Sequence, residues 1–103
     1  MAYADTVKPV IKSVKAISNR EYEISLNKTA TAFQRISLDD VTHGKQVQIF
    51  AVNHEADKIN LLTATTDSAQ IRFKINQLQD SKGNLTELSA LTIQSSTVQD
   101  IVP

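Results

Sequence analysis

The chain has 103 residues, of which 41% are hydrophobic, and it contains no cysteine. Lysine plus arginine (11) balances aspartate plus glutamate (11), so the formal net charge at neutral pH is zero. The length predicts a single domain with its own core, and the lack of cysteine excludes disulfides, thiolate zinc sites and cysteine nucleophiles. The charge balance argues against nucleic acid as a partner, and no apolar run is long enough to predict membrane insertion.

The first part of the chain predicts a linker followed by two strands. Residues 1–9 are expected to be an entry linker, and Met1–Ala2 suggests the start of a domain taken from a longer protein. Strands are expected at Val10–Ile17 and Glu21–Leu26, joined by a turn so short that they should pair as a hairpin. The second strand alternates cleanly, which predicts that Tyr22 and its apolar neighbours face a core.

The middle of the chain predicts further short strands between polar breaks. Phenylalanine, isoleucine and leucine at alternating or near-alternating positions favour strands, and aspartate, asparagine and glycine favour the breaks between them. The expected order is a strand within Ala32–Leu38, a loop containing Asp39–Asp40, a strand at Gln46–Val52, a turn at Asn53–Asp57 and a strand at Lys58–Ala64.

The last part of the chain contains the clearest strand. In Gln70–Ile75 three apolar residues, Phe73 among them, alternate with two cations, which is typical of a strand with one dry face. A final strand is expected to begin at Leu91–Ile93 and to extend through Val98. Leu85–Leu91 is the one helical candidate, but it is too short to predict a helix.

About seven short strands at intervals of roughly 8–12 residues predict an all-β, antiparallel β-sandwich. The turn signals place this domain at residues 10–98, and residues 99–103 are expected to be a C-terminal linker. A turn is also expected at Thr65–Ala69, immediately before the clearest strand.

Three short motifs occur in a fixed order near the two ends of the chain. Asp5-Thr6-Val7-Lys8-Pro9 leads into a first strand that ends in Ser13-Val14-Lys15-Ala16, and the second strand ends in Asn27-Lys28. Near the end, a strand is followed by Leu78 and by Asp80-Ser81-Lys82-Gly83-Asn84. Together these motifs resemble the bacterial Ig-like domains of S-layer and other cell-surface proteins. The resemblance implies an Ig-like sandwich that spaces or assembles domains without catalysis.

The motif Asp80-x-x-Gly83-Asn84 has two interpretations. The side-chain oxygens of Asp80 and Asn84 are ligands that Ca²⁺ accepts, so they are a candidate calcium site. The favoured interpretation is a structural turn, in which Asp80 caps backbone N–H groups while Gly83 and Asn84 adopt positive φ. A calcium site needs several carboxylates, so neither a metal nor a cofactor is predicted.

No residue is assigned a catalytic role. No serine lies in a Gly-x-Ser-x-Gly elbow, no glycine-rich loop is available to hold a phosphate, and the glutamates form no recognisable acid pair for glycoside hydrolysis. His43 and His54 are predicted on solvated loops without metal-ligand spacing. Tyr22 and Phe73 are expected in the core. Whether Phe50 faces the core or the solvent is left open, because its apolar neighbours lie on the opposite face of the same strand. The sequence does not predict an enzyme.

The resemblance therefore implies a non-catalytic structural module of a bacterial cell-surface or S-layer protein. It is expected outside the cell, at the cell surface or in the cell wall. Its expected partners are neighbouring domains of the same protein or copies of itself. Two alternatives stay open: an adhesion module that binds cell-wall polysaccharide or another ligand, and an accessory domain of an extracellular hydrolase.

Overall fold

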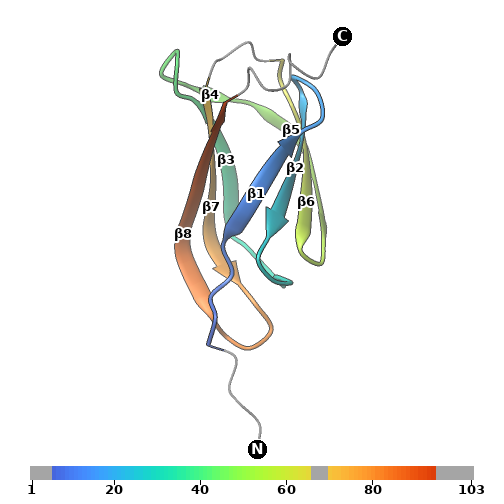
Figure 1. The fold of residues 1–103 in the computed structure, drawn as a ribbon, viewed down its shortest axis with the longest axis vertical. Helices are drawn as coiled ribbons and strands as arrows, with labels where there is room; N and C mark the ends of the chain where they lie inside the picture. Colours follow the sequence, from blue (N-terminus) through green and yellow to red (C-terminus); the bar gives the residue numbers. More distant parts are fainter. Residues whose placement is uncertain (1–5, 66–69, 95–103) are drawn as a thin grey trace, which may run out of the picture.

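The computed structural model describes residues 6–65 and 70–94, which form two antiparallel four-stranded sheets packed against each other (Figure 1). The prediction of an all-β sandwich is confirmed, with eight described strands where about seven were expected. Within these ranges no helix is long and apolar enough to cross a bilayer. The strands are β1 (Ile11–Ala16), β2 (Glu21–Leu26), β3 (Arg35–Asp40), β4 (Lys45–Val47), β5 (Ile49–Glu55), β6 (Lys58–Thr63), β7 (Gln70–Gln79) and β8 (Leu85–Gln94).

One sheet has the strand order β1-β2-β6-β5 and the other has the order β4-β3-β7-β8. All of the strand pairs are antiparallel. The edge strands β1 and β8, one from each sheet, lie next to each other, and the backbone N–H of Ile11 donates to Ser89 Oγ at 2.9 Å. At the other side of the sandwich, β4 and β5 are the edge strands and are separated in the chain by Gln48 alone.

The core lies between the two sheets and is mostly aliphatic. Alternation along β2 turns Tyr22, Ile24 and Leu26 inward, where each is at most 2% exposed. Tyr22 meets Phe73 of the facing sheet edge to face, with ring centroids 5.2 Å apart and planes at 67°. Burying an aliphatic or phenylalanine side chain of this size contributes about 1.5–3 kcal/mol, so the interleaved faces account for much of the stability. The bounds predicted for the second strand and the inward places of Tyr22 and Phe73 are confirmed.

The third strand begins later and ends later than expected. It was predicted within Ala32–Leu38 and is observed at Arg35–Asp40, so the predicted loop at Asp39–Asp40 is wrong. Two contacts explain why polar residues occupy the end of this strand. Asp39 Oδ2 lies 2.8 Å from Lys74 Nζ on the paired strand β7. Asp40, only 2% exposed, accepts hydrogen bonds from the following turn.

The strand predicted at Gln46–Val52 is two strands. The chain leaves one sheet after β4, crosses at Gln48 and joins the other sheet as β5, with an irregular register between Ile49 and Ala51. The backbone carbonyl of Gln48, where the chain crosses between the sheets, accepts a hydrogen bond from the N–H of Ala64 at 2.8 Å. This carbonyl is therefore not left without a hydrogen-bond donor at the crossing. The turn predicted at Asn53–Asp57 is also too long, because β5 continues to Glu55.

The last hairpin is longer than predicted on both strands. β7 runs on to Gln79, and β8 begins at Leu85, where the start was expected at Leu91. Gln77 has φ +57, and the buried positions of β7 shift there from 71, 73 and 75 to 78. Because the buried side chains change from odd to even positions here, strict alternation in the sequence does not predict the second half of β7. The predicted extension through Val98, and most of the turn at Thr65–Ala69, fall outside the described residues.

Candidate functional site

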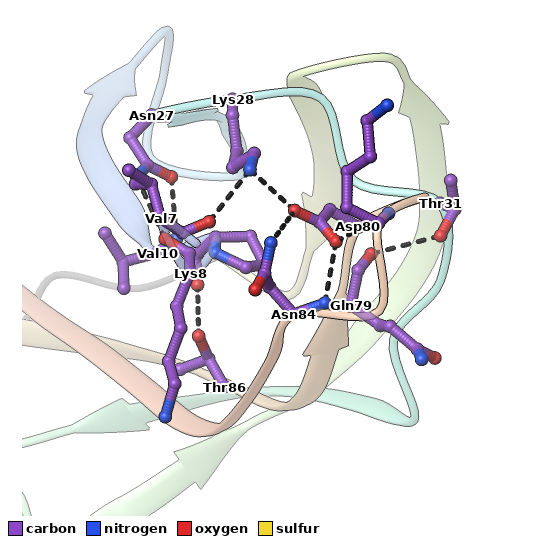
Figure 2. A network of polar contacts seen from close by, with 12 residues as sticks. Val7, Lys8, Val10, Asn27, Lys28, Thr31, Gln79, Asp80, Asn84 and Thr86 are labelled. Carbon is purple, nitrogen blue, oxygen red and sulfur yellow. Dashed lines mark hydrogen bonds and ion pairs between the residues drawn. The ribbon is translucent and has the colours of Figure 1, made fainter. Parts of the chain in front are cut away.

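The connection between β7 and β8 is a turn organised by Asp80 (Figure 2). Asp80 Oδ1 accepts hydrogen bonds from the backbone N–H groups of Lys82 and Asn84, both at 2.9 Å. Asn84 Nδ2 donates to Asp80 Oδ2 at 2.9 Å, and Gly83 has φ +87. The expectation of positive φ at Asn84 is wrong, since that residue contributes through its side chain. Glycine is required at the position where a side chain would be strained.

Lys28, from the loop after β2, completes the surroundings of Asp80. Its Nζ lies 2.6 Å from Asp80 Oδ2, and the two side chains are 18% and 2% exposed. The ammonium of Lys28, followed by the hydrogen bonds from Asn84 and Lys82, holds the pKa of Asp80 well below its usual range. The carboxylate is therefore ionised at neutral pH and paired at both oxygens.

The same loop holds the segment through which the chain enters β1. The backbone N–H of Val10 donates to Asn27 Oδ1 at 2.8 Å, and Asn27 Nδ2 donates to the Lys8 carbonyl at 3.0 Å. The N–H of Asn27 donates in turn to the Val10 carbonyl at 3.1 Å. Lys28 Nζ donates to the Val7 carbonyl at 2.8 Å, so one ammonium links this segment to Asp80 (Figure 2).

The entry side of β8 supplies one more bond to this segment. Thr86 Oγ1 donates to the carbonyl of the buried Pro9 at 2.5 Å. We call Val7–Val10 the entry segment. The side chains that hold it, directly or through Lys28, are called the entry clasp: Asn27, Lys28, Asp80, Asn84 and Thr86.

The geometry favours the structural turn over calcium binding at Asp80. Its two oxygens already accept four hydrogen bonds, one of them from a cation, so Ca²⁺ would have to displace Lys28. In the part of the chain that the structure describes, no three histidine or acidic side chains lie close enough to hold a metal ion. Asp80 and Asn84 lie together as the sequence indicated, but without the further carboxylates that a calcium site needs.

At the opposite end of the sandwich, Asp40 organises the turn between β3 and β4. Its Oδ1 accepts from the N–H of His43 at 3.0 Å, and its Oδ2 lies 2.7 Å from His43 Nδ1. An open depression of about 330 Å³ beside it is lined by charges of both signs, including Lys45 and Arg72. The prediction that His43 lies on a loop is confirmed, and its ring serves as a turn contact.

The exposed apolar residues of the β5 edge form the remaining feature of interest. Phe50 is 57% exposed and Val52 is 45% exposed. His54 lies on this strand and not on a loop, so that prediction is wrong; its ring contacts Phe33 at a centroid distance of 5.5 Å. The structure thus answers the question left open for Phe50, whose ring is available to solvent.

No protein-family model, curated protein or solved structure matches this chain. What this molecule can do must therefore be argued from its own geometry.

Sequence reasoning found the turn at Asp80 but missed the entry clasp. In the sequence, Asn27-Lys28 and the residues before Pro9 contribute only to a family resemblance, which predicts no contact between them. The structure brings these two motifs and the Asp80 turn together at one end of the sandwich. No local pattern in the sequence signals these contacts, because the residues that make them are far apart in the chain.

Proposed function

We propose that this chain is an Ig-like, non-catalytic structural module of a bacterial cell-surface or S-layer protein, which spaces domains and supports their assembly. The strand order supports the Ig-like part of the proposal. In an Ig constant-type sandwich, the first, second, fifth and fourth strands form one sheet and the third, sixth and seventh form the other. If β4 is counted as an added edge strand, β1-β2-β6-β5 and β3-β7-β8 follow the same order.

The observation that carries the structural role is the placement of the chain's entry and exit. The entry segment lies beside the start of β8, and β8 then runs the length of the sheet to Gln94, which pairs with Gln70 at the other end. Such a module separates whatever lies before it from whatever lies after it. The entry clasp fixes the direction in which the chain enters, which a spacer needs and a freely hinged domain lacks.

The location can be tested with antibodies raised against this chain. In the bacterium that makes the protein, we expect intact cells to be labelled and the label to remain in the cell-envelope fraction. An antibody against a cytosolic protein, which labels cells only after lysis, is the matched control. Labelling of this chain only after lysis would contradict the proposal.

A second candidate function, binding of a cell-wall polysaccharide, is favoured by the exposed ring of Phe50. Sugar rings stack on exposed aromatic side chains, and Phe50 lies beside the exposed Val52 on an edge strand. If this function holds, immobilised cell-wall polysaccharide retains the domain, and Phe50→Ala abolishes the retention. Leu88→Ala is the control, because Leu88 is similarly exposed (55%) but lies on the other sheet. If the polysaccharide retains both variants equally well, Phe50 does not bind it.

A further inference from the structure

Tension applied through this chain acts along the long axis of the domain. Thr86 binds the Pro9 carbonyl near the start of β8, and β8, the last described strand, runs from there to Gln94. Ten residues of strand span roughly 33 Å. The domain measures 52 × 27 × 20 Å, so the points of entry and exit are separated along its longest dimension.

The entry segment and β8 are arranged so that this tension shears them past each other. Pro9 contacts Thr86 and Ile11 contacts Ser89, so the two stretches run in the same direction (Figure 1). When the entry is pulled one way and the exit the other, these contacts are loaded together. Contacts that share a force resist it better than contacts that open one after another.

The entry clasp adds bonds that oppose the same sliding motion. Asn27 holds the backbone of Lys8 and Val10 from the side of β2, and Lys28 holds the Val7 carbonyl. Lys28 is itself restrained by Asp80, and hydrogen bonds between charged groups are stronger than neutral ones. The entry segment is thus held from the loop after β2 and from β8, two elements that lie on either side of it.

We propose that the entry clasp is a mechanical lock that sets the force at which this domain unfolds. The inference rests on the proposed structural function and deepens it, because it assigns the resistance to tension to particular side chains. Forced unfolding is governed by the unfolding rate and not by equilibrium stability alone. Breaking the lock should therefore raise the unfolding rate under tension more than its effect on equilibrium stability implies.

The experiment is constant-force single-molecule unfolding of the whole chain. Because the chain has no cysteine, handles can be attached uniquely through Thr6→Cys and Thr92→Cys. Asn27→Ala removes two side-chain bonds to the entry segment and is expected to raise the unfolding rate at a given force about tenfold. Thr86→Val, which keeps the shape and removes the bond to Pro9, is expected to change the rate in the same direction.

Two controls separate the lock from a general loss of stability. With the first handle moved to Lys12→Cys, the force enters beyond the entry segment, and Asn27→Ala is expected to have little effect on the rate. Asn53→Ala, the same substitution at an exposed position on β5, is expected to leave the rate unchanged with either pair of handles. An Asn27→Ala effect that is absent, or equal in both pulling geometries, overturns the proposal.

The outcome is independent of the antibody test of the proposed function. If intact cells are labelled but clasp variants unfold at the wild-type rate, the mechanical lock is refuted and the structural role stands. If cells are labelled only after lysis while the clasp variants unfold faster in the end-to-end geometry, the lock stands as a property of the fold and the surface role is refuted.

Discussion

Tyr22 places a polar hydroxyl group inside the hydrophobic core. The side chain is 1% exposed, and its hydroxyl has no hydrogen-bond partner among the residues that the structure describes. Burying a hydroxyl without a partner costs roughly 1–3 kcal/mol in proteins. The edge-to-face contact of the Tyr22 ring with Phe73 offsets part of this cost.

We expect Tyr22→Phe to leave the fold as stable as the wild type or to stabilise it by about 1 kcal/mol. Urea unfolding at pH 7 measures the difference. Phe73→Leu is the comparison: it keeps a hydrophobic side chain but loses the aromatic contact, so it is expected to destabilise. A clear loss of stability in Tyr22→Phe would show that the hydroxyl is bonded in solution.

The same hydroxyl predicts how stability depends on pH in alkali. Burial raises the pKa of Tyr22 from 10.0 to about 12. The unfolded chain therefore ionises at lower pH than the folded one, and stability is lost progressively as the pH rises above 10 towards 12. The loss is about 1.4 kcal/mol for each pH unit in that window. Tyr22→Phe is expected to lack this part of the decline, so its stability curve should diverge upward from that of the wild type above pH 10.

Ala56 is strained in the tight turn between β5 and β6. It has φ +52, a left-handed conformation that costs a residue with a Cβ roughly 1–2 kcal/mol. Ala56→Gly is expected to stabilise the domain by about 0.5–1 kcal/mol, after the extra chain entropy of glycine is subtracted. Ala51→Gly, on β5 with ordinary φ, is expected to destabilise by a similar amount. Thermal melting of both variants would show opposite shifts, and shifts of the same sign would contradict this assignment.

At the scale of elements, sequence alternation predicted the strands that face a single core. β2 and the start of β7 follow it closely, because one face of each is buried and the other is wet. The predictions failed where long-range contacts outweigh local pattern. Asp39 lies opposite Arg72 in the strand register, and its carboxylate forms an ion pair with Lys74 of the same neighbouring strand. The chain also changes sheets at Gln48, which a run of apolar residues cannot reveal.

The candidate site was predictable to a similar degree. The turn residues Asp80 and Gly83 follow from local chemistry, since aspartate caps N–H groups and glycine tolerates positive φ. The entry clasp joins Lys28 to Val7 and to Asp80, positions far apart in the chain. Only the folded topology places them together, so spacing alone could not indicate these bonds.

The turn between β7 and β8 is expected to depend strongly on the charge of Asp80. Asp80→Asn removes the negative charge that lies 2.6 Å from the mostly buried ammonium of Lys28, so we expect the melting temperature to fall by several degrees. Asp39→Asn is the matched control, because the Asp39–Lys74 pair is about one-third exposed and such pairs contribute about 1 kcal/mol or less. An equal effect of the two substitutions would contradict the special role of Asp80.

The lowered pKa of Asp80 sets the pH range of this contribution. It is fully present above the ordinary value of 3.8 and is lost progressively as the pH falls below that value, because the unfolded state then binds the proton first. Asp80→Asn should therefore lose less stability than the wild type when both are taken from pH 5 to pH 2. Parallel acid-denaturation curves for the two proteins would show that Lys28 does not hold this carboxylate ionised in solution.

At the scale of the whole molecule, the two sheets depend on each other because neither buries its apolar face alone. Side chains of β2 and β6 pack against those of β3 and β7, and Tyr22 meets Phe73 across the interface. Two of the strand pairs, β2 with β6 and β3 with β7, join distant parts of the chain and lie at the centre of each sheet. A fold of this topology is expected to form slowly, in milliseconds to seconds, because long loops must close before the core forms.

This interdependence predicts a single unfolding transition that needs neither metal nor disulfide. Tyrosine fluorescence reports on the interface between the sheets through Tyr22, whereas far-ultraviolet circular dichroism reports on the strands. Both signals are expected to change at the same urea concentration, because separating the sheets exposes the face that keeps each one folded.

Reductant should have no effect on a chain without cysteine. Chelator should have none either, because Lys28 occupies the position that a cation would take beside Asp80. Two separate transitions, or a midpoint that rises with added calcium, would show that the sheets or the Asp80 turn are stabilised in another way.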